Sequence, residues 1–265
     1  MKANRWQAGF AVMATLSWGV AHVSPGYSQT MDNTGRMDRH GVRVILVGDS
    51  TMATRTGYGD ALCKRFVEGV ECINLARGGR SSKSFRVEGL WDNVQKILAN
   101  NRASDKPRTT YVLVQFGHND QPGKPERSTD LATEFPVNMA RYVDEVKAAG
   151  GHTVLVTPLT RRSFKNGVLQ NDLRPWAETV IRIAREKSVP LVDLNAKSYA
   201  AVAAMGTVEA DTLAEEPPPK APLPEGVKSR FDYTHLGEKG AALFAGMMAG
   251  EITVAVPALA AYLKP

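Results

Sequence analysis

The sequence predicts an α/β protein in which helices cover both faces of a mostly parallel, five-stranded sheet. Short apolar segments rich in β-branched residues alternate along the chain with helical segments, as repeated βαβ units require. These apolar segments have no polar face, which is typical of strands buried on both sides. The chain has 265 residues, 43% of them hydrophobic, which suits one globular domain with a sizeable core.

The first 28 residues are expected to be a secretory signal peptide, outside the fold. Lys2 and Arg5 precede an apolar run that reaches about Val20, the layout that secretory signals share. An uncleaved anchor is the alternative, although the run is shorter than the ~20 residues that a membrane span needs. Residues 29–265 then form a single secreted or periplasmic domain, with no membrane segment once the signal is removed.

The first half of the mature chain supplies three of the expected strands. VRVILVG, residues 42–48, is a β-branched run bounded by Gly and Asp, and is the first buried strand. A helix over 59–67 leads to a short strand at 71–74, and a helical pattern spans 90–99. TTYVLVQFG, residues 109–117, is the third strand.

The second half repeats the alternation. A long helix over 131–149 ends at two glycines, where a C-cap is expected. The remaining elements are a strand at 152–158, a helix at 174–187, a strand at 189–194 and a helix at 237–250. Together the elements predict a flavodoxin-like three-layer sandwich, in which ligands bind beyond the carboxyl ends of the strands.

One segment departs from this alternation. Residues 215–226, EEPPPKAPLPEG, contain five prolines and can form neither a helix nor a central strand. The segment is a loop or semi-rigid arm, and it serves either as a wall or lid of the active site or as a passive surface excursion.

Charge and cysteine content narrow the functional classes. The formal net charge is +6, and loss of Lys2 and Arg5 with the signal lowers it. This balance suits an anionic substrate or simply a solvated basic surface, and no Lys/Arg run suggests nucleic acid. Cys63 and Cys72 form a disulfide if the protein is exported, and two free buried thiols are the alternative.

Two motifs supply a candidate nucleophile and base. Ser50 in GDSTMA directly follows the first strand, where a turn exposes its hydroxyl; an ordinary helix N-cap is the alternative. Asp232 and His235 in DYTHLGEKGA lie three residues apart before the last helix. His235 would take the Ser50 proton while Asp232 orients the imidazole; a turn aspartate and a surface histidine are the alternative.

Two further motifs follow the second and third strands and should face the same crevice. In ARGGRSSKSF, Gly79 has no side chain to obstruct a backbone N–H, and in QFGHND, Asn119 offers a side-chain N–H. With the amide of Ser50, these groups would form an oxyanion hole. A turn glycine and a helix cap are the alternatives, and His118 either positions the Asn119 loop or fills a gap.

Taken together, the four motifs resemble the SGNH (GDSL-type) hydrolase family over nearly the whole mature chain. The resemblance implies a Ser-His-Asp acyl-ester hydrolase that passes through an acyl-enzyme and needs no metal or organic cofactor. GDSTMA, GGRSSKSF and FGHND look like the rhamnogalacturonan acetylesterase branch. That branch implies an acetylated pectic polysaccharide as substrate, although the Pro-rich arm departs from its fungal members.

Alternative activities remain open at this stage. The same site could serve acetyl-xylan, small acyl esters or lipids, or the protein could be a carbohydrate-binding protein without catalysis. Arg161 and Arg162 follow the fourth strand and could pair with a uronate carboxylate, and Arg80 could line the same crevice. Each of these arginines could instead be solvated or structural. The sequence predicts no oligomeric state.

Overall fold

The structure, a computed structural model, describes residues 41–217 and 231–265. The expected signal peptide and the greater part of the Pro-rich segment 215–226 lie outside the described residues. The main sheet has five strands, all parallel, in the order β2-β1-β3-β4-β7, which confirms the predicted fold class. These strands are β1 (Val42–Gly48), β2 (Glu71–Asn74), β3 (Thr109–Gln115), β4 (His152–Val156) and β7 (Leu191–Val192).

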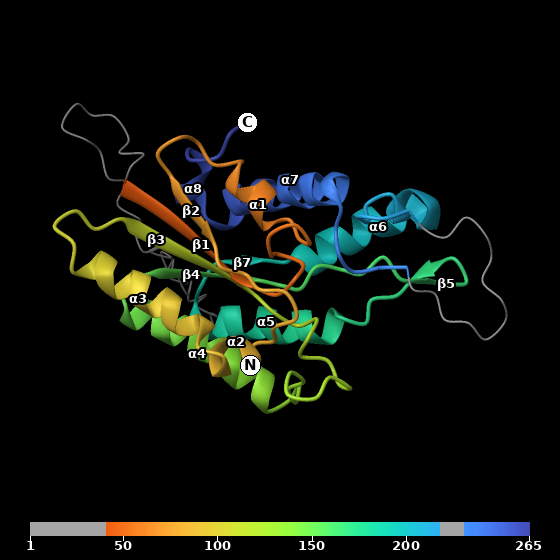
Figure 1. Cartoon of the computed structure of the whole chain (residues 1–265), viewed down its shortest axis with the longest axis horizontal. Coiled ribbons are helices and arrows are strands. Elements are labelled where there is room, and N and C mark those ends of the chain that lie inside the picture. Colours follow the sequence, from red (N-terminus) through yellow and green to blue (C-terminus); the bar gives the residue numbers. More distant parts are fainter. Residues whose placement is uncertain (1–40, 218–230) are drawn as a thin grey trace, which may run out of the picture.

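Helices form a layer on each side of this sheet (Figure 1). One layer consists of α1 (Gly59–Cys63), α6 (Leu194–Asp211), α7 (Glu238–Ala255) and α8 (Pro257–Ala260). The opposite layer consists of α2 (Ser84–Val87), α3 (Leu90–Arg102), α4 (Glu134–Ala148) and α5 (Arg174–Lys187).

The side chains of β1 explain why both faces are covered. Val44 and Leu46 pack into the core beneath α7, whereas Ile45 and Val47 pack into the core beneath α3 and α4. All four side chains are fully buried, because successive residues of a strand point to opposite faces. The absence of a polar face in the sequence therefore corresponds to two separate apolar cores.

Several elements differ in extent from the expected ones. The helix expected over 59–67 ends at Cys63, and Phe66 instead bridges to Leu263 near the end of the chain. The fifth strand is shorter than 189–194, because Asp193 caps α6 by accepting a hydrogen bond from the backbone N–H of Ala196. The helix expected over 131–149 begins at Glu134.

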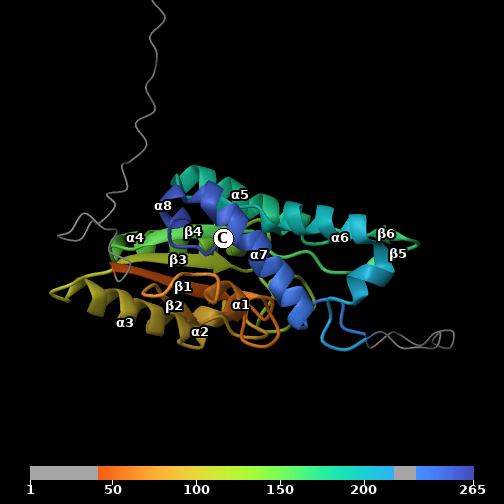
Figure 2. The same ribbon diagram turned by 90° about the horizontal axis from the view of Figure 1, so that it is seen from above.

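Two features were not expected from the sequence. Helix α6 follows β7 directly, and a two-stranded antiparallel hairpin, β5 (Phe164–Lys165) and β6 (Val168–Leu169), precedes α5. The hairpin lies beside α6 (Figure 2), and the Tyr199 hydroxyl donates to the carbonyl of Leu169 over 3.3 Å. Within 41–217 and 231–265, no helix is long and apolar enough to cross a bilayer.

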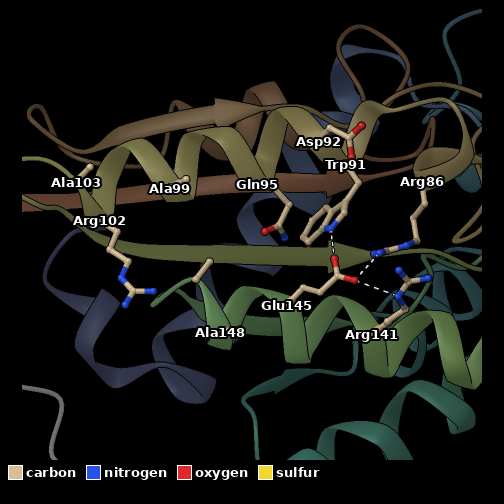
Figure 3. Close-up of a pocket in the computed structure, with 11 residues that line it drawn as sticks. Arg86, Trp91, Asp92, Gln95, Ala99, Arg102, Ala103, Arg141, Glu145 and Ala148 are labelled. Atoms are coloured by element: carbon tan, nitrogen blue, oxygen red, sulfur yellow. Dashed lines mark hydrogen bonds and ion pairs between the residues drawn. The ribbon is translucent and has the colours of Figure 1, made fainter.

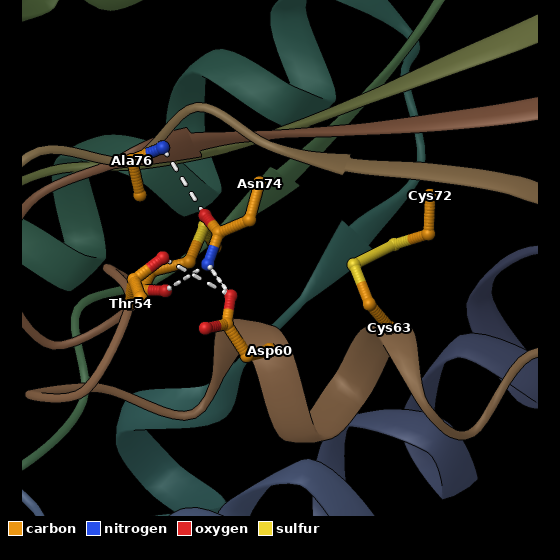
Figure 4. The surroundings of a disulfide bond; sticks show 7 residues. Thr54, Asp60, Cys63, Cys72, Asn74 and Ala76 are labelled. Carbon is orange, nitrogen blue, oxygen red and sulfur yellow. Dashed lines mark hydrogen bonds between the residues drawn. A yellow bond between two sulfur atoms is a disulfide. The ribbon is translucent and has the colours of Figure 1, made fainter.

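A disulfide joins Cys63 at the end of α1 to Cys72 in β2 (Figure 4). The two Cα atoms are 5.4 Å apart, within the usual range for such a bond. Beside it, the Asn74 amide donates to Asp60 over 2.7 Å and to the carbonyl of Met52 over 3.1 Å. The bond and these contacts fasten α1 to the first two strand ends.

Candidate active site

Ser50 lies at the carboxyl end of β1, in a tight turn that the preceding aspartate holds. The side-chain Oδ1 of Asp49 accepts hydrogen bonds from the backbone N–H and the hydroxyl of Thr51, at 2.9 and 2.8 Å. The carbonyl of Ser50 accepts from the Thr56 hydroxyl at 2.8 Å. Ser50 is 6% exposed, so the turn that carries its hydroxyl is largely buried.

The loop before α7 brings His235 and Asp232 to this hydroxyl. The Nε2 atom of His235 lies 2.7 Å from Ser50 Oγ, and its Nδ1 lies 2.6 Å from Asp232 Oδ2. Asp232 Oδ1 also accepts from the backbone N–H groups of Thr234 and His235, at 2.8 and 2.9 Å. The three side chains therefore form one hydrogen-bonded chain, although 185 residues separate Ser50 from His235.

The surroundings of Asp232 keep its carboxylate ionised. Burial by itself raises the pKa of Asp232, but hydrogen bonds from the backbone N–H groups of His235 and Thr234 and from the imidazole outweigh that effect. The pKa of Asp232 is consequently lowered. An ionised carboxylate can accept a hydrogen bond from the Nδ1–H of His235. In that tautomer Nε2 carries no proton and would be free to accept the proton of Ser50.

Arg162 holds the loop that carries both residues. It is 1% exposed, and its Nη2 donates to the carbonyls of Asp232 and His235 over 2.7 and 2.8 Å. Its backbone N–H donates to the carbonyl of Tyr233 over 2.8 Å. The structure thus places Arg162 inside the protein, beneath the loop, instead of on a surface that a uronate could contact.

The loops of Gly79 and Asn119 contact each other near the turn of Ser50. Gly79 has a φ of +77°, a backbone conformation that favours glycine. The Asn119 amide donates one hydrogen to the carbonyl of Arg80 over 3.0 Å, and its second hydrogen remains for another acceptor. The adjacent Gly78 comes nearest to the nucleophile: a Cβ atom there would lie 3.7 Å from Ser50 Cβ.

Asp120 ties these two loops together. Its carboxylate accepts from the backbone N–H of Ser82 at 3.1 Å, from the Ser82 hydroxyl at 2.5 Å and from the Thr129 hydroxyl at 3.0 Å. Asp120 is fully buried, and burial, only partly offset by these hydrogen bonds, raises its pKa to about 6. The network fixes the relative position of the Gly79 and Asn119 loops.

A second histidine and aspartate lie directly behind the nucleophile. The Nδ1 atom of His118 is 3.3 Å from Asp49 Oδ2, and both side chains are buried. Burial alone would raise the pKa of Asp49, but His118 and the hydrogen bonds from Thr51 together lower it. Asp49 therefore stays ionised and can hold the turn of Ser50.

The other two arginines expected at the substrate are already engaged. Arg161 Nη1 pairs with Asp172, and Arg80 donates to Glu88 from both Nε and Nη2 and to the carbonyl of Gly78. Sequence reasoning missed the neighbouring Lys124, whose ammonium contacts the carbonyl of His118 and lies 3.4 Å from Asn119 Oδ1. Its only signal was its place in the loop that follows FGHND.

Among the described residues, no group of three or more His, Cys, Asp or Glu side chains lies close enough together to hold a metal ion.

The chain is similar to known proteins over most of its length. Residues 46–243 match the model of the GDSL-like Lipase/Acylhydrolase family. Two curated relatives from Bacillus subtilis (strain 168) are 34% identical to this chain. The probable rhamnogalacturonan acetylesterase YesY aligns over 78% of this chain and 90% of its own length, and the rhamnogalacturonan acetylesterase RhgT over 78% and 88%.

Solved structures show the same fold. A Bacillus subtilis protein, 23% identical, superposes with a TM-score of 0.64 over 80% of this chain and 56% of its own, so this chain spans little more than half of it. A variant of the acetylxylan esterase Axe2 from Geobacillus stearothermophilus, 18% identical, gives a TM-score of 0.54 over 80% and 94%. With most of its length matched by the family model, the chain belongs to the GDSL-like lipase/acylhydrolase (SGNH) family of carboxylic ester hydrolases.

Proposed function

We propose that this protein is an acetylesterase that removes O-acetyl groups from rhamnogalacturonan, with Ser50 as nucleophile, His235 as base and Asp232 as its orienting carboxylate. The observation that carries the proposal is the hydrogen-bonded chain from Asp232 through His235 to Ser50, at 2.6 and 2.7 Å. The acetyl and pectic specificity rests on the two relatives from Bacillus subtilis.

The first half-reaction forms an acetyl-enzyme. Ser50 Oγ attacks the acetyl carbonyl carbon as its proton moves to His235 Nε2, and the positive imidazolium faces the Asp232 carboxylate. The carbonyl oxygen becomes an oxyanion that the amides of Ser50, Gly79 and Asn119 would stabilise. When the tetrahedral intermediate collapses, His235 returns the proton to the departing sugar oxygen.

The second half-reaction repeats these steps with water. His235 takes a proton from the water as the water oxygen attacks the acetyl carbonyl, and then protonates Ser50 Oγ as acetate leaves. Each of these steps uses side chains and backbone amides of the chain together with water. Arg162 contributes by donating hydrogen bonds to the backbone carbonyls of Asp232 and His235. Asp120 contributes by holding the loops of Gly79 and Asn119 together.

We also propose that the chain works as one secreted or periplasmic domain after loss of residues 1–28. The disulfide between Cys63 and Cys72 supports this proposal, because such bonds persist in oxidising compartments. N-terminal sequencing of the protein recovered from its native host tests it: a mature start between residues 22 and 29 is expected, and recovery of Met1 in the cell fraction contradicts it.

Acetate release from acetylated rhamnogalacturonan tests the activity, with acetyl-xylan and p-nitrophenyl esters as comparison substrates. The wild type should release acetate fastest from rhamnogalacturonan, and Ser50→Ala should abolish release while unfolding at the same temperature. Faster turnover of acetyl-xylan would assign the xylan substrate instead, and faster turnover of long-chain esters would assign a lipase.

A further inference from the structure

A hollow of about 590 Å³ lies next to the turn of Ser50, because Thr56 and Gly78, which both adjoin Ser50, are among the residues that line it. One lining residue, Thr56, contacts both segments that carry the proposed catalytic residues: its hydroxyl donates to the carbonyl of Ser50 over 2.8 Å, and its backbone carbonyl accepts from the N–H of Leu236, the residue after His235, over 3.0 Å. The hollow is lined by Ala53, Thr54, Arg55, Thr56, Asn74, Leu75, Ala76, Arg77, Gly78, Leu90 and Asn93.

The charge of this lining is one-sided. Arg55 and Arg77 are both exposed, and no acidic residue lines the hollow. Neither arginine takes part in an ion pair with another residue of 41–217 or 231–265. The nearby carboxylate of Asp60 is held by Asn74 and Thr54 (Figure 4). The two guanidinium groups therefore keep their donors for a ligand.

The backbone at Arg55 is a second, independent sign of function. Its φ is +69°, a conformation that costs a non-glycine residue of order 1 to 3 kcal/mol and is concentrated at functional sites. Gly57 follows two residues later in the same loop, and a Cβ there would lie 2.2 Å from the backbone of Thr51. The loop is thus packed tightly onto the turn of the nucleophile, with Arg55 at its outer bend.

Another groove, about 840 Å³ between α3 and α4, differs in this respect. There Glu145 accepts from Arg86, Arg141 and the indole of Trp91 (Figure 3), so its charges are largely satisfied within the protein. The lining of that groove includes neither Thr56 nor Gly78, the two residues through which the hollow adjoins Ser50. Proximity to the nucleophile, and not size alone, therefore distinguishes the hollow of Arg55 and Arg77.

We infer that the hollow of Arg55 and Arg77 binds the carboxylate of a uronate residue in the substrate chain. This inference rests on the proposed acetylesterase function and names its specificity residues. Guanidinium groups recognise planar carboxylates through paired hydrogen bonds, and the volume falls in the range of pockets that enclose small ligands. Neutral acetylated polymers lack the group that both arginines would bind.

The test replaces both arginines, as Arg55→Asn with Arg77→Gln, because asparagine tolerates a positive φ. We expect the ratio of kcat/KM on acetylated rhamnogalacturonan to kcat/KM on p-nitrophenyl acetate to fall about tenfold, through KM, as the loss of a charge-assisted hydrogen bond implies. Added salt should lower this ratio for the wild type more than for the variant.

A matched variant carries the same loss of charge at the opposite edge of the sheet. Arg102→Gln with Arg185→Gln removes two arginines from the last turns of α3 and α5, which lie away from the carboxyl ends of the strands. Its ratio should equal that of the wild type. An equal ratio in the Arg55 and Arg77 variant as well would overturn the inference.

Calorimetry separates this inference from the proposed function. Ser50→Ala is titrated with deacetylated rhamnogalacturonan oligosaccharides, with and without the Arg55 and Arg77 replacements. Weaker binding after the replacements supports the uronate site whether or not acetate is released. Equal binding, with acetate still released by the wild type, refutes the uronate site alone. Acetate release from no pectic substrate refutes the proposed function.

Discussion

Two histidine–aspartate pairs flank Ser50, and they differ in burial and in what lies beyond the imidazole. The side chains of His235 and Asp232 are 37% and 49% exposed, and Ser50 Oγ lies beyond Nε2. The side chains of His118 and Asp49 are 3% and 0% exposed, and the Nε2 of His118 has no hydrogen-bond partner among the described residues.

The difference teaches that a histidine beside a carboxylate does not by itself make a catalytic base. The base must also reach a nucleophile and exchange protons with solvent and substrate. His235 meets both conditions, whereas His118 is enclosed beneath the turn and contacts the aspartate that shapes it. The exposed pair is suited to chemistry and the buried pair to holding the nucleophile in place.

The largest effect should come from breaking the exposed pair. His235→Gln removes the proton acceptor of Ser50, so kcat for acetate release should fall about 10⁴-fold or more. The free energy of unfolding should change by less than about 1 kcal/mol, because the side chain is partly exposed. Steady-state kinetics and urea unfolding measure the two quantities; a loss of activity below tenfold would remove His235 as the base.

The next effect concerns the buried arginine on which the exposed pair depends. Arg162→Gln frees the carbonyls of Asp232 and His235, and the resulting misplacement of the imidazole should cost about 10²-fold in kcat. KM should change less. Arg162→Lys should recover part of the loss, since an ammonium can still donate to a carbonyl.

A second readout separates positioning from folding in these variants. The rate at which a serine-directed organophosphonate labels Ser50 reports on its activation by His235. This rate should fall in Arg162→Gln at temperatures well below its unfolding midpoint. Normal labelling with a lowered midpoint would mean that Arg162 acts on stability alone.

Breaking the buried pair should have the opposite signature. His118→Gln removes the imidazole that lies 3.3 Å from the buried Asp49 carboxylate, and the loss of this buried contact should lower the free energy of unfolding by about 3 kcal/mol. The kcat of the folded variant should fall by less than tenfold. Urea unfolding and kinetics on the same preparation check both, and a 10⁴-fold loss of kcat with unchanged stability would reverse the assignment of the two pairs.

The smallest effect is a pH dependence of stability, which contrasts Asp49, beside His118, with a second buried aspartate that has no histidine partner. Asp120 is also buried but has hydroxyl and amide partners, and its pKa is raised to about 6. The folded protein therefore keeps a proton on Asp120 that the unfolded chain loses from about pH 4 upward. Its contribution to stability should fall by about 3 kcal/mol at most as pH rises through that window.

Asp120→Asn provides the control for that prediction. Because asparagine does not titrate, stability between pH 4 and 6 should fall less steeply in the variant than in the wild type. The lowered pKa of Asp49 acts in the other direction: its contribution is present above the pKa of an unfolded aspartate and is lost as pH falls below it. Parallel stability curves for wild type and variant would refute the raised pKa of Asp120.

The strands and the positions of the motifs could be predicted from the sequence, because both depend on local patterns. The β-branched run of β1 and the glycines after α4 are visible without a structure, and so is Ser50 at a strand end. The sequence did not reveal helix α6, because its alanine-rich segment lacks a clear apolar stripe. The strand expected over 189–194 was too long: β7 begins only after Pro190, and Asp193 already caps that helix.

Within the candidate site, the sequence pointed to residues whose proposed roles depend on their chemical type. The sequence did not show that Arg162 holds the loop of Asp232 and His235. The groups that Arg162 binds are backbone carbonyls about 70 residues further along the chain. A carbonyl has no letter in the sequence. Arg161 and Arg162 are identical neighbours there, yet one pairs with Asp172 near the surface and the other is buried.

The separation of 185 residues between Ser50 and His235 has a consequence for biosynthesis. As the chain leaves the ribosome from its N-terminus, Ser50 is synthesised well before Asp232 and His235. Until the DYTHLG segment has emerged and docked onto Arg162, the Ser50 hydroxyl has no imidazole beside it. Under the proposed mechanism, a nascent chain that stops before this segment has no base to activate Ser50.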